Sequence, residues 1–327
     1  MDDALLVLLL TAAACAPLGV FLILRRLSMM ADAISHTVLL GIVLAFFVTH
    51  DLGSPWLLFG AALMGVVTVS LVELLGKTSL VKYDDAIGVI FPLLFALAVI
   101  LISKYAGNAH LDTDMVLMGE VIYAGLNTVG IGGVEIPAAA LKMGGLALLI
   151  AAFITVFYKE LKVSTFDGEY ARLIGVPTGI LFYTFMSLTS LTTVAAFDAV
   201  GAILVISFFI APGAAALLFT KHLSHTLLLA LLVSMVNAAL GYALAVHMNA
   251  SIAGLCAVIN MLVYLLALLM GPKGAVTTYI RRKRSMRQMQ RDLFLLHIGR
   301  HTAECVESAE NHADEIGDHL KWEESKV

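Results

Sequence analysis

The sequence predicts an all-α, polytopic membrane protein from two observations, its composition and the length of its apolar segments. Of the 327 residues, 60% are hydrophobic and only 13% are charged, whereas soluble globular domains carry about a quarter charged residues. Apolar runs long enough for a helix to cross a hydrocarbon core of about 30 Å recur along most of the chain. Together these observations exclude a soluble globular fold.

Nine segments have the length and composition of membrane-spanning helices. In chain order, the predicted spans are 4–24, 29–49, 54–75, 86–103, 141–158, 178–197, 199–219, 223–246 and 249–270. A further apolar piece, 114–126, is too short to cross alone, so we expect a half-depth helix there. The sequence therefore predicts a transmembrane domain over 1–270, followed by a polar, helical tail over 271–327.

The distribution of Lys and Arg predicts the orientation in the membrane. All of the 20 cationic side chains except Lys104 and Lys142 lie in one set of connections or in the tail. Because positively charged connections stay on the cytoplasmic side, we expect a cytoplasmic tail and an external N-terminus. Nine spans agree with this assignment, whereas a full crossing by 114–126 would reverse the side of the N-terminus.

The first cytoplasmic connection leads into "RRLSMMADAISH", residues 25–36, where Asp32 and His36 interrupt an apolar run. A four-residue spacing places both side chains on one face of a helix. If that helix begins near Ser28, the two residues lie roughly 9 and 15 Å beyond Arg26, inside the membrane. A carboxylate there costs about 2.5–3.5 kcal/mol on insertion scales, so it should face a cavity, a partner or an ion.

A carboxylate oxygen and an imidazole nitrogen form half a site for a divalent first-row metal ion, so Asp32 and His36 are candidate metal ligands. Two other interpretations stay open on the residues alone. The pair can be neutral and hydrogen-bonded within the bundle, or a shifted helix can leave Asp32 in headgroup water. No cysteine lies near the pair, which argues against a Cu(I) site.

The connection over about 159–177 is the longest one between predicted full spans on the cytoplasmic side. Within it, "FDGEYARLIGVP" has a helix start signal at Asp167 and stop signals at Gly175 and Pro177. We expect a short amphipathic helix parallel to the membrane. An ordinary interfacial helix and a docking element fit this pattern equally well.

Several motifs carry a resemblance to a known family. Glu169, Tyr170 and Ala171, followed by Gly175, resemble the "EAA…G" coupling loop of ABC importer permeases. The blocks "RRLSMMADAISHTVLLGIVLA", "DDAIGVIF" and "AVGAILVISFFIAPGAAALL" are similar to those of the metal-ion importer permeases, and the match covers about residues 5–270 in order. Asp198 departs from the pattern, because many relatives carry Gln there, and the 271–327 tail is not universal in the family.

The resemblance implies a permease subunit in a bacterial cytoplasmic (inner) membrane that imports manganese, zinc or iron, with manganese favoured. The metal is then the transported substrate rather than a permanently bound cofactor. The expected partners are membrane lipid, an extracellular or periplasmic metal-binding protein, a cytoplasmic ATP-binding subunit and a second permease copy. The second copy would contribute its own Asp32 and His36 to a shared pore.

The resemblance also assigns ATPase docking to Asp167, Glu169, Ala171 and Gly175. The chain itself is not expected to be an enzyme, because "GKTS" at 76–79 lacks the glycine that a phosphate loop needs at the position of Leu71. An ATP-independent secondary transporter or channel is the main alternative. An intramembrane metalloenzyme is a weaker one, since the sequence has no HExxH motif.

Other polar residues in or near the spans have more than one interpretation. Asp112, Asp114 and Asp198 fall on the predicted external face, where they form an anionic mouth or ordinary solvated carboxylates. Glu120, in the predicted half-depth piece, is a candidate gate element. Asn237 and Asn260 are expected to hydrogen-bond between helices.

The tail begins with a basic segment that is suited to anionic lipid headgroups. His297, His301 and Cys305 follow at i, i+4 and i+8, a spacing that can hold a metal ion on one helical face. An ordinary surface helix explains the same residues. A faint likeness of "RDLFLLHIGRH" to the start of a winged-helix regulator is too short to assign nucleic-acid binding.

Overall fold

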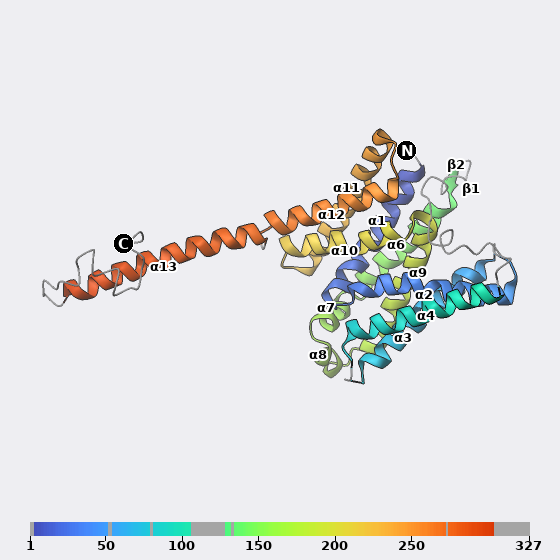
Figure 1. The fold of residues 1–327 in the computed structure, drawn as a ribbon, viewed down its shortest axis with the longest axis horizontal. Helices are drawn as coiled ribbons and strands as arrows, with labels where there is room; N and C mark the ends of the chain where they lie inside the picture. The colour runs from blue at the N-terminus through green and yellow to red at the C-terminus, as the bar shows by residue number, and fades with distance from the viewer. Residues whose placement is uncertain are drawn as a thin grey trace. The chain divides into compact units, whose positions relative to one another are not determined.

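The computed structural model describes residues 3–51, 54–78, 81–105, 128–131, 134–272 and 274–303. Within these residues, nine helices are long and apolar enough to cross a membrane, which confirms the predicted fold class and number of spans (Figure 1). The spans are α1 (Asp3–Leu24), α2 (Ser28–Thr49), α3 (Pro55–Gly76), α4 (Tyr83–Tyr105), α6 (Ala138–Val156), α9 (Thr178–Val200), α10 (Ala202–Phe219), α11 (Leu223–Met248) and α12 (Ile252–Met270). The other elements are the strands β1 (Thr128–Ile131) and β2 (Val134–Pro137) and the helices α7 (Tyr158–Phe166), α8 (Gly168–Leu173) and α13 (Ala275–Ala303).

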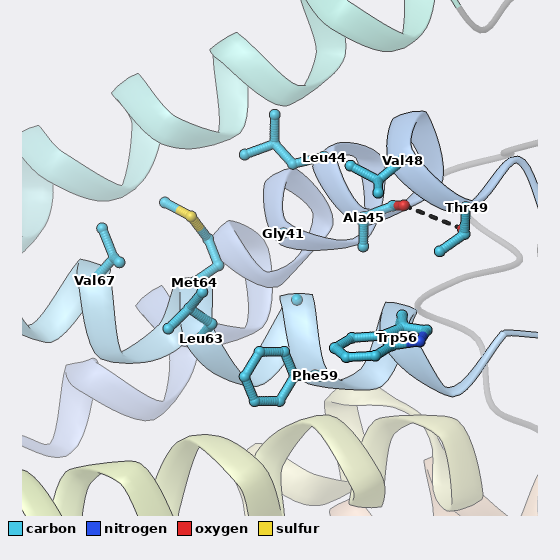
Figure 2. A pocket seen from close by; sticks show the side chains of 11 residues that line it. Gly41, Leu44, Ala45, Val48, Thr49, Trp56, Phe59, Leu63, Met64 and Val67 are labelled. Atoms are coloured by element: carbon cyan, nitrogen blue, oxygen red, sulfur yellow. Dashed lines mark hydrogen bonds between the residues drawn. The ribbon is translucent and has the colours of Figure 1, made fainter.

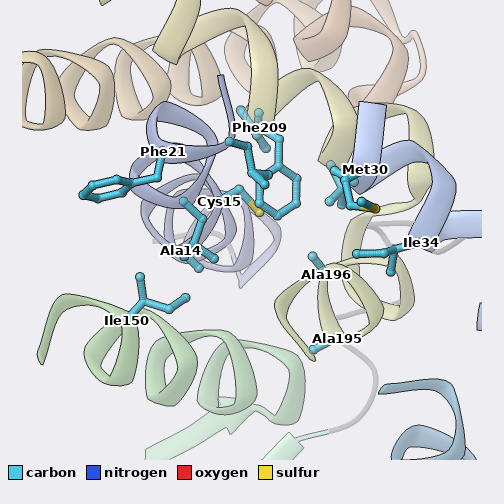
Figure 3. Packing of buried hydrophobic residues seen from close by; sticks show 14 of the residues in the cluster. Ala14, Cys15, Phe21, Met30, Ile34, Ile150, Ala195, Ala196 and Phe209 are labelled. Carbon is cyan, nitrogen blue, oxygen red and sulfur yellow. The ribbon is translucent and has the colours of Figure 1, made fainter. Parts of the chain in front are cut away.

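Helix α1 lies at the centre of the transmembrane unit and packs against α6, α9, α10 and α11. Phe21 and Cys15 of α1 are fully buried, together with Phe209 of α10 and Ile150 of α6 (Figure 3). Ile34 extends this cluster into α2. Cys15 therefore serves as a small apolar core residue, as its isolated position in the sequence indicates.

Helix α2 is held against α3 by close backbone packing at two glycines. A Cβ atom added to Gly41 would lie 2.3 Å from the carbonyl oxygen of Gly60, and one added to Gly60 would lie 2.7 Å from that of Gly41. Only glycine permits this approach, which is common where helices pack in membranes. One turn away, the Thr68 hydroxyl of α3 donates to Thr37 Oγ1 of α2 at 2.8 Å. These contacts fix the helix that carries Asp32 and His36.

A β-hairpin precedes α6, which the sequence analysis did not predict. Its antiparallel strands pair Thr128 with Pro137 and Ile131 with Val134. The available signal was a Gly-Gly pair at 132–133 between two runs containing β-branched residues, a common hairpin pattern. The predicted half-depth helix over 114–126 lies outside the described residues, as do Asp112, Asp114 and Glu120.

The chain divides into two compact units, 1–268 and 269–327. In the second unit, α13 is a single helix whose basic side chains from Arg281 to Arg291 are exposed. Positions 297 and 301 belong to this helix, but their side chains and Cys305 lie outside the described part. The tail metal site therefore stays a prediction.

Candidate functional site

Asp32 and His36 lie on one face of α2, as their spacing predicts. The distance from His36 Nε2 to Asp32 Oδ1 is 3.7 Å, and the side chains of His36 and Asp32 are 38% and 37% exposed, respectively. Their neighbours on the same turns are buried: Met30, Ala31, Ala33, Ile34, Ser35, Thr37 and Val38. The polar pair thus lies on a partly open face of α2 that also carries the exposed Met29, while the other side of these turns packs into the bundle.

Helix α4 supplies the neighbours of the His36 ring. The imidazole centroid lies 5.5 Å from the ring centroids of both Phe91 and Phe95, tilted against the first and nearly perpendicular to the second. These aromatic contacts restrict the orientation of the imidazole without using either of its nitrogens. Neither phenylalanine was predicted from the sequence, although "FPLLF" places them four residues apart on one helical face.

The residues that the structure describes offer too few ligands for a complete metal site at this position. Among the described residues, no group of three or more His, Cys, Asp or Glu side chains is placed to hold a metal ion. Divalent first-row ions take four to six ligands. Among the residues that the structure describes, Asp32 and His36 therefore supply at most half of a coordination shell.

The connection after α6 forms two short helices, α7 and α8, where one was predicted. Helix α8 begins where expected, because Asp167 is its N-cap and Oδ1 of Asp167 accepts a 2.9 Å hydrogen bond from the backbone N–H of Tyr170. It ends at Leu173, and Gly175, two residues later, turns the chain with a φ of 85° that glycine adopts readily. The Val176 N–H then bonds to the carbonyl of Ala171 at 3.0 Å, completing a Schellman turn.

The surface of α8 combines one buried contact with an exposed apolar patch. Ala171 is fully buried and attaches α8 to the bundle. Glu169 is exposed, and the apolar side chains of Phe166, Tyr170, Leu173 and Ile174 are each more than half exposed around it. Large apolar side chains gathered on a connection between spans mark an interaction surface.

The remaining candidate residues take part in local pairs. Lys142 of α6 and Asp198 of α9 form an exposed ion pair at 3.4 Å, so the carboxylate at position 198 has a cationic neighbour. The predicted contact between Asn237 and Asn260 is confirmed by a hydrogen bond of 2.8 Å between α11 and α12.

An apolar groove of about 660 Å³ follows the outer surface of α2 and α3 (Figure 2). It is lined by small residues that include Gly41, Ala45 and Gly60, and by the aromatic rings of Trp56 and Phe59. None of the residues that line it is a carboxylate, an imidazole or a thiol. The groove therefore lacks metal ligands and is distinct from the Asp32–His36 face.

The chain belongs to the ABC 3 transport family, whose model matches residues 1–271. The resemblance to the membrane-spanning permeases of ABC-type metal importers is thereby confirmed.

Two relatives and one solved structure extend this result. The chain is 43% identical over 280 residues to the manganese transport system membrane protein MntD of Bacillus subtilis, covering 85% of this chain and 95% of the relative. It is 42% identical over 327 residues to the zinc transport system membrane protein TroD of Treponema pallidum, covering 98% and 88%. The fold matches a chain of the structure of PsaBC from Streptococcus pneumoniae in complex with Fab, with a TM-score of 0.69, 27% identity and coverage of 86% and 94%.

Proposed function

We propose that this chain is the permease subunit of an ATP-driven importer that moves a divalent transition-metal ion into the cytoplasm, with Asp32 and His36 as its ligands. The observation that carries the proposal is the placement of this pair on the open face of a buried, membrane-spanning helix. A carboxylate in that position is stabilised by a cation that passes it. The relatives named for manganese and zinc transport support the same substrate class.

A second copy of the chain would complete the metal site. Two copies with facing α2 helices would supply two carboxylate oxygens and two imidazole nitrogens, the number of ligands that a four-coordinate ion requires. The two aspartates would also neutralise the double charge of the ion inside the membrane. The partial exposure of both side chains in the single chain leaves them accessible to such a partner.

Helix α8 is the proposed docking element for a separate ATP-binding subunit on the cytoplasmic side. Its exposed apolar patch would enter a groove of that subunit, while Asp167 and Gly175 fix the two ends of the helix. Cytoplasmic placement of α8 and of the tail follows from the distribution of Lys and Arg. On the opposite side of a bacterial inner membrane, an external binding protein would deliver the metal.

Manganese is the favoured substrate, with zinc or iron as alternatives. Oxygen and nitrogen ligands suit all three ions, and no thiolate is available to select a softer one. Relatives named for manganese and for zinc transport match the chain at 43% and 42% identity, so sequence identity supports both ions about equally.

Cellular metal content, measured by mass spectrometry with and without this chain, tests the proposal. We expect manganese, or else zinc or iron, to fall when the chain is removed and to return when it is restored. Flux through the purified chain in liposomes without any ATPase would instead support the ATP-independent alternative.

A further inference from the structure

Arg25 lies between α2, the helix that carries Asp32 and His36, and the α7–α8 loop. It follows the last residue of α1, and its side chain reaches across to α7. Its Nε donates to Thr165 Oγ1 at 3.1 Å and its Nη2 donates to Ser164 Oγ at 2.9 Å. Nearly 140 residues separate these partners in the sequence. The guanidinium is thus held by the helix that leads directly into α8.

Two aromatic rings of α9 line the other side of this cation. The Arg25 guanidinium carbon lies 5.5 Å from the centroid of the Phe185 ring and 5.9 Å from that of Phe182. Both distances are within the range of cation–π attraction. The two rings contact the guanidinium by cation–π attraction, whereas its N–H groups donate to the hydroxyls of α7. Helix α7 is therefore the hydrogen-bonded partner of Arg25.

The corner between Arg25 and α2 is short and structured. It consists of residues 25–27 alone, and the Leu27 N–H bonds to the Leu22 carbonyl at 2.8 Å across Arg26, whose φ is 60°. This is a Schellman turn, so the residues between the end of α1 and the start of α2 are held by backbone hydrogen bonds. Asp32 lies only about one helical turn beyond Ser28, roughly 6 Å along the axis. Few freely rotating backbone torsions therefore separate Arg25 from Asp32 and His36. A displacement of Arg25 would move the helix that carries them.

The hydrogen bonds between Arg25 and α7 are of a kind that can break and form again during a transport cycle. Burial lowers the pKa of Arg25 to about 10, so the side chain remains a cation at neutral pH. Its hydrogen-bond partners on α7 are neutral hydroxyls, and among the described residues it forms no ion pair with a carboxylate. Hydrogen bonds from a cation to hydroxyls are directional, yet they are weaker than a bidentate carboxylate pair and can be remade during a cycle.

We propose that Arg25 is a positioning residue that transmits movement of the α7–α8 loop to α2, and so to Asp32 and His36. The inference rests on the proposed function, since it assumes that a cytoplasmic ATPase moves this loop. It assigns to Arg25 a role in coupling rather than in binding the metal or the ATPase.

The test uses the full permease assembled with its ATPase in proteoliposomes, where metal uptake and ATP hydrolysis are measured together. In Arg25→Gln, we expect metal moved per ATP to fall about tenfold, within the usual range of coupling between sites, while ATP hydrolysis continues. The pair Ser164→Ala/Thr165→Val removes the same hydrogen bonds and should reproduce the loss with Arg25 intact. Arg25→Lys should be intermediate, because a lysine lacks the planar fork that reaches both hydroxyls.

Arg26→Gln is the matched control, because Arg26 is an adjacent and exposed arginine. It should leave metal moved per ATP unchanged. A parallel loss of uptake, ATP hydrolysis and membrane-inserted protein in the Arg25 and hydroxyl variants would indicate a structural role and overturn the proposal. An unchanged ratio in both would also overturn it.

A fluorescent label at the far end of α2 separates this proposal from the proposed function. Val48→Cys is suitable because Val48 is 83% exposed, and Cys305→Ser removes the remaining cysteine outside the spans. We expect an ATP-dependent signal in the wild-type complex that is lost in Arg25→Gln, whether or not metal is present. A preserved signal in Arg25→Gln would overturn the coupling role. A normal wild-type signal without metal uptake would count against the proposed function alone, and the absence of any wild-type signal would overturn both.

Discussion

The face of α2 that carries Asp32 and His36 and the exposed apolar patch of α8 differ in polarity from their surroundings, in opposite directions. On α2, a carboxylate and an imidazole stand partly open on a helix built for the membrane interior. On α8, large apolar side chains are exposed on a connection outside the spans, with Leu173 85% exposed. Each departure costs free energy unless another molecule occupies the surface. This difference supports two separate proposals: the first surface would bind a cation, and the second would dock into an apolar groove of another protein.

Removing the ligands on α2 should have the largest effect. Asp32→Ala and His36→Ala are each expected to reduce the accumulation of the transported metal to the level of cells lacking the chain, because either change leaves one ligand per copy. Cellular metal content, normalised to the amount of permease in the membrane, is the measurement. His247→Ala and Asp292→Ala alter exposed residues elsewhere and should accumulate metal normally. Normal metal accumulation in Asp32→Ala would show that this face of α2 does not bind the transported metal.

Placing a charge on the α8 patch should have the next largest effect. Leu173→Asp is expected to weaken binding of the ATPase by more than about tenfold, because an unpaired carboxylate would have to be buried in an apolar interface at a cost of about 2 kcal/mol or more. Co-purification of the ATPase with the tagged permease measures this loss. Leu295→Asp, an equally drastic change at an exposed site on α13, should have no effect on co-purification. Equal recovery of the ATPase with both variants would contradict the docking role.

The aromatic contacts of His36 should affect the metal site by a smaller amount. Phe95→Leu removes one of the two rings beside the imidazole, and such aromatic pairs contribute about 0.5–1.5 kcal/mol. We expect the metal concentration for half-maximal uptake to rise roughly two- to tenfold, with Phe95→Tyr restoring it. Phe47→Leu removes a comparable ring contact with Tyr105 and should leave this concentration unchanged. A fall in maximal rate alone would show that Phe95 does not position the ligand.

The smallest effect is expected at the exposed pair of Lys142 and Asp198. Both side chains are more than half exposed, and such pairs contribute about 0–1 kcal/mol to stability. Lys142→Ala should therefore shift the thermal unfolding midpoint in detergent only slightly. Asp198→Asn should likewise change uptake little, because Lys142 already offsets the carboxylate charge. A large loss of uptake in Asp198→Asn would restore the anionic mouth as a functional element.

The sequence predicted the parts of this molecule that depend on local pattern. Span length and hydropathy identified all nine candidate membrane-spanning helices of the described residues, with ends that differ by a few residues, as for 86–103 against Tyr83–Tyr105 in α4. Side-chain chemistry and spacing placed the cap at Asp167 and put Asp32 and His36 on one face, because both features are set within a single helical turn.

Contacts between distant segments were not readable from the same patterns. The hydrogen bonds of Arg25 to Ser164 and Thr165, and the rings of Phe91 and Phe95 beside His36, depend on how helices pack rather than on spacing within one helix. Hydropathy treats these phenylalanines as ordinary apolar residues of a span. Arginine at a span end is explained by orientation alone, so the role proposed for Arg25 could be inferred only from its contacts with α7.

ATP-dependent metal uptake into proteoliposomes, with the permease and its ATPase purified together, tests the central claim most directly. We predict uptake of manganese, or else zinc or iron, by the wild-type complex. The double variant Asp32→Ala/His36→Ala should show only background uptake while it still assembles with the ATPase and hydrolyses ATP. Uptake by the double variant at the wild-type rate would contradict the assignment of this pair as the metal ligands.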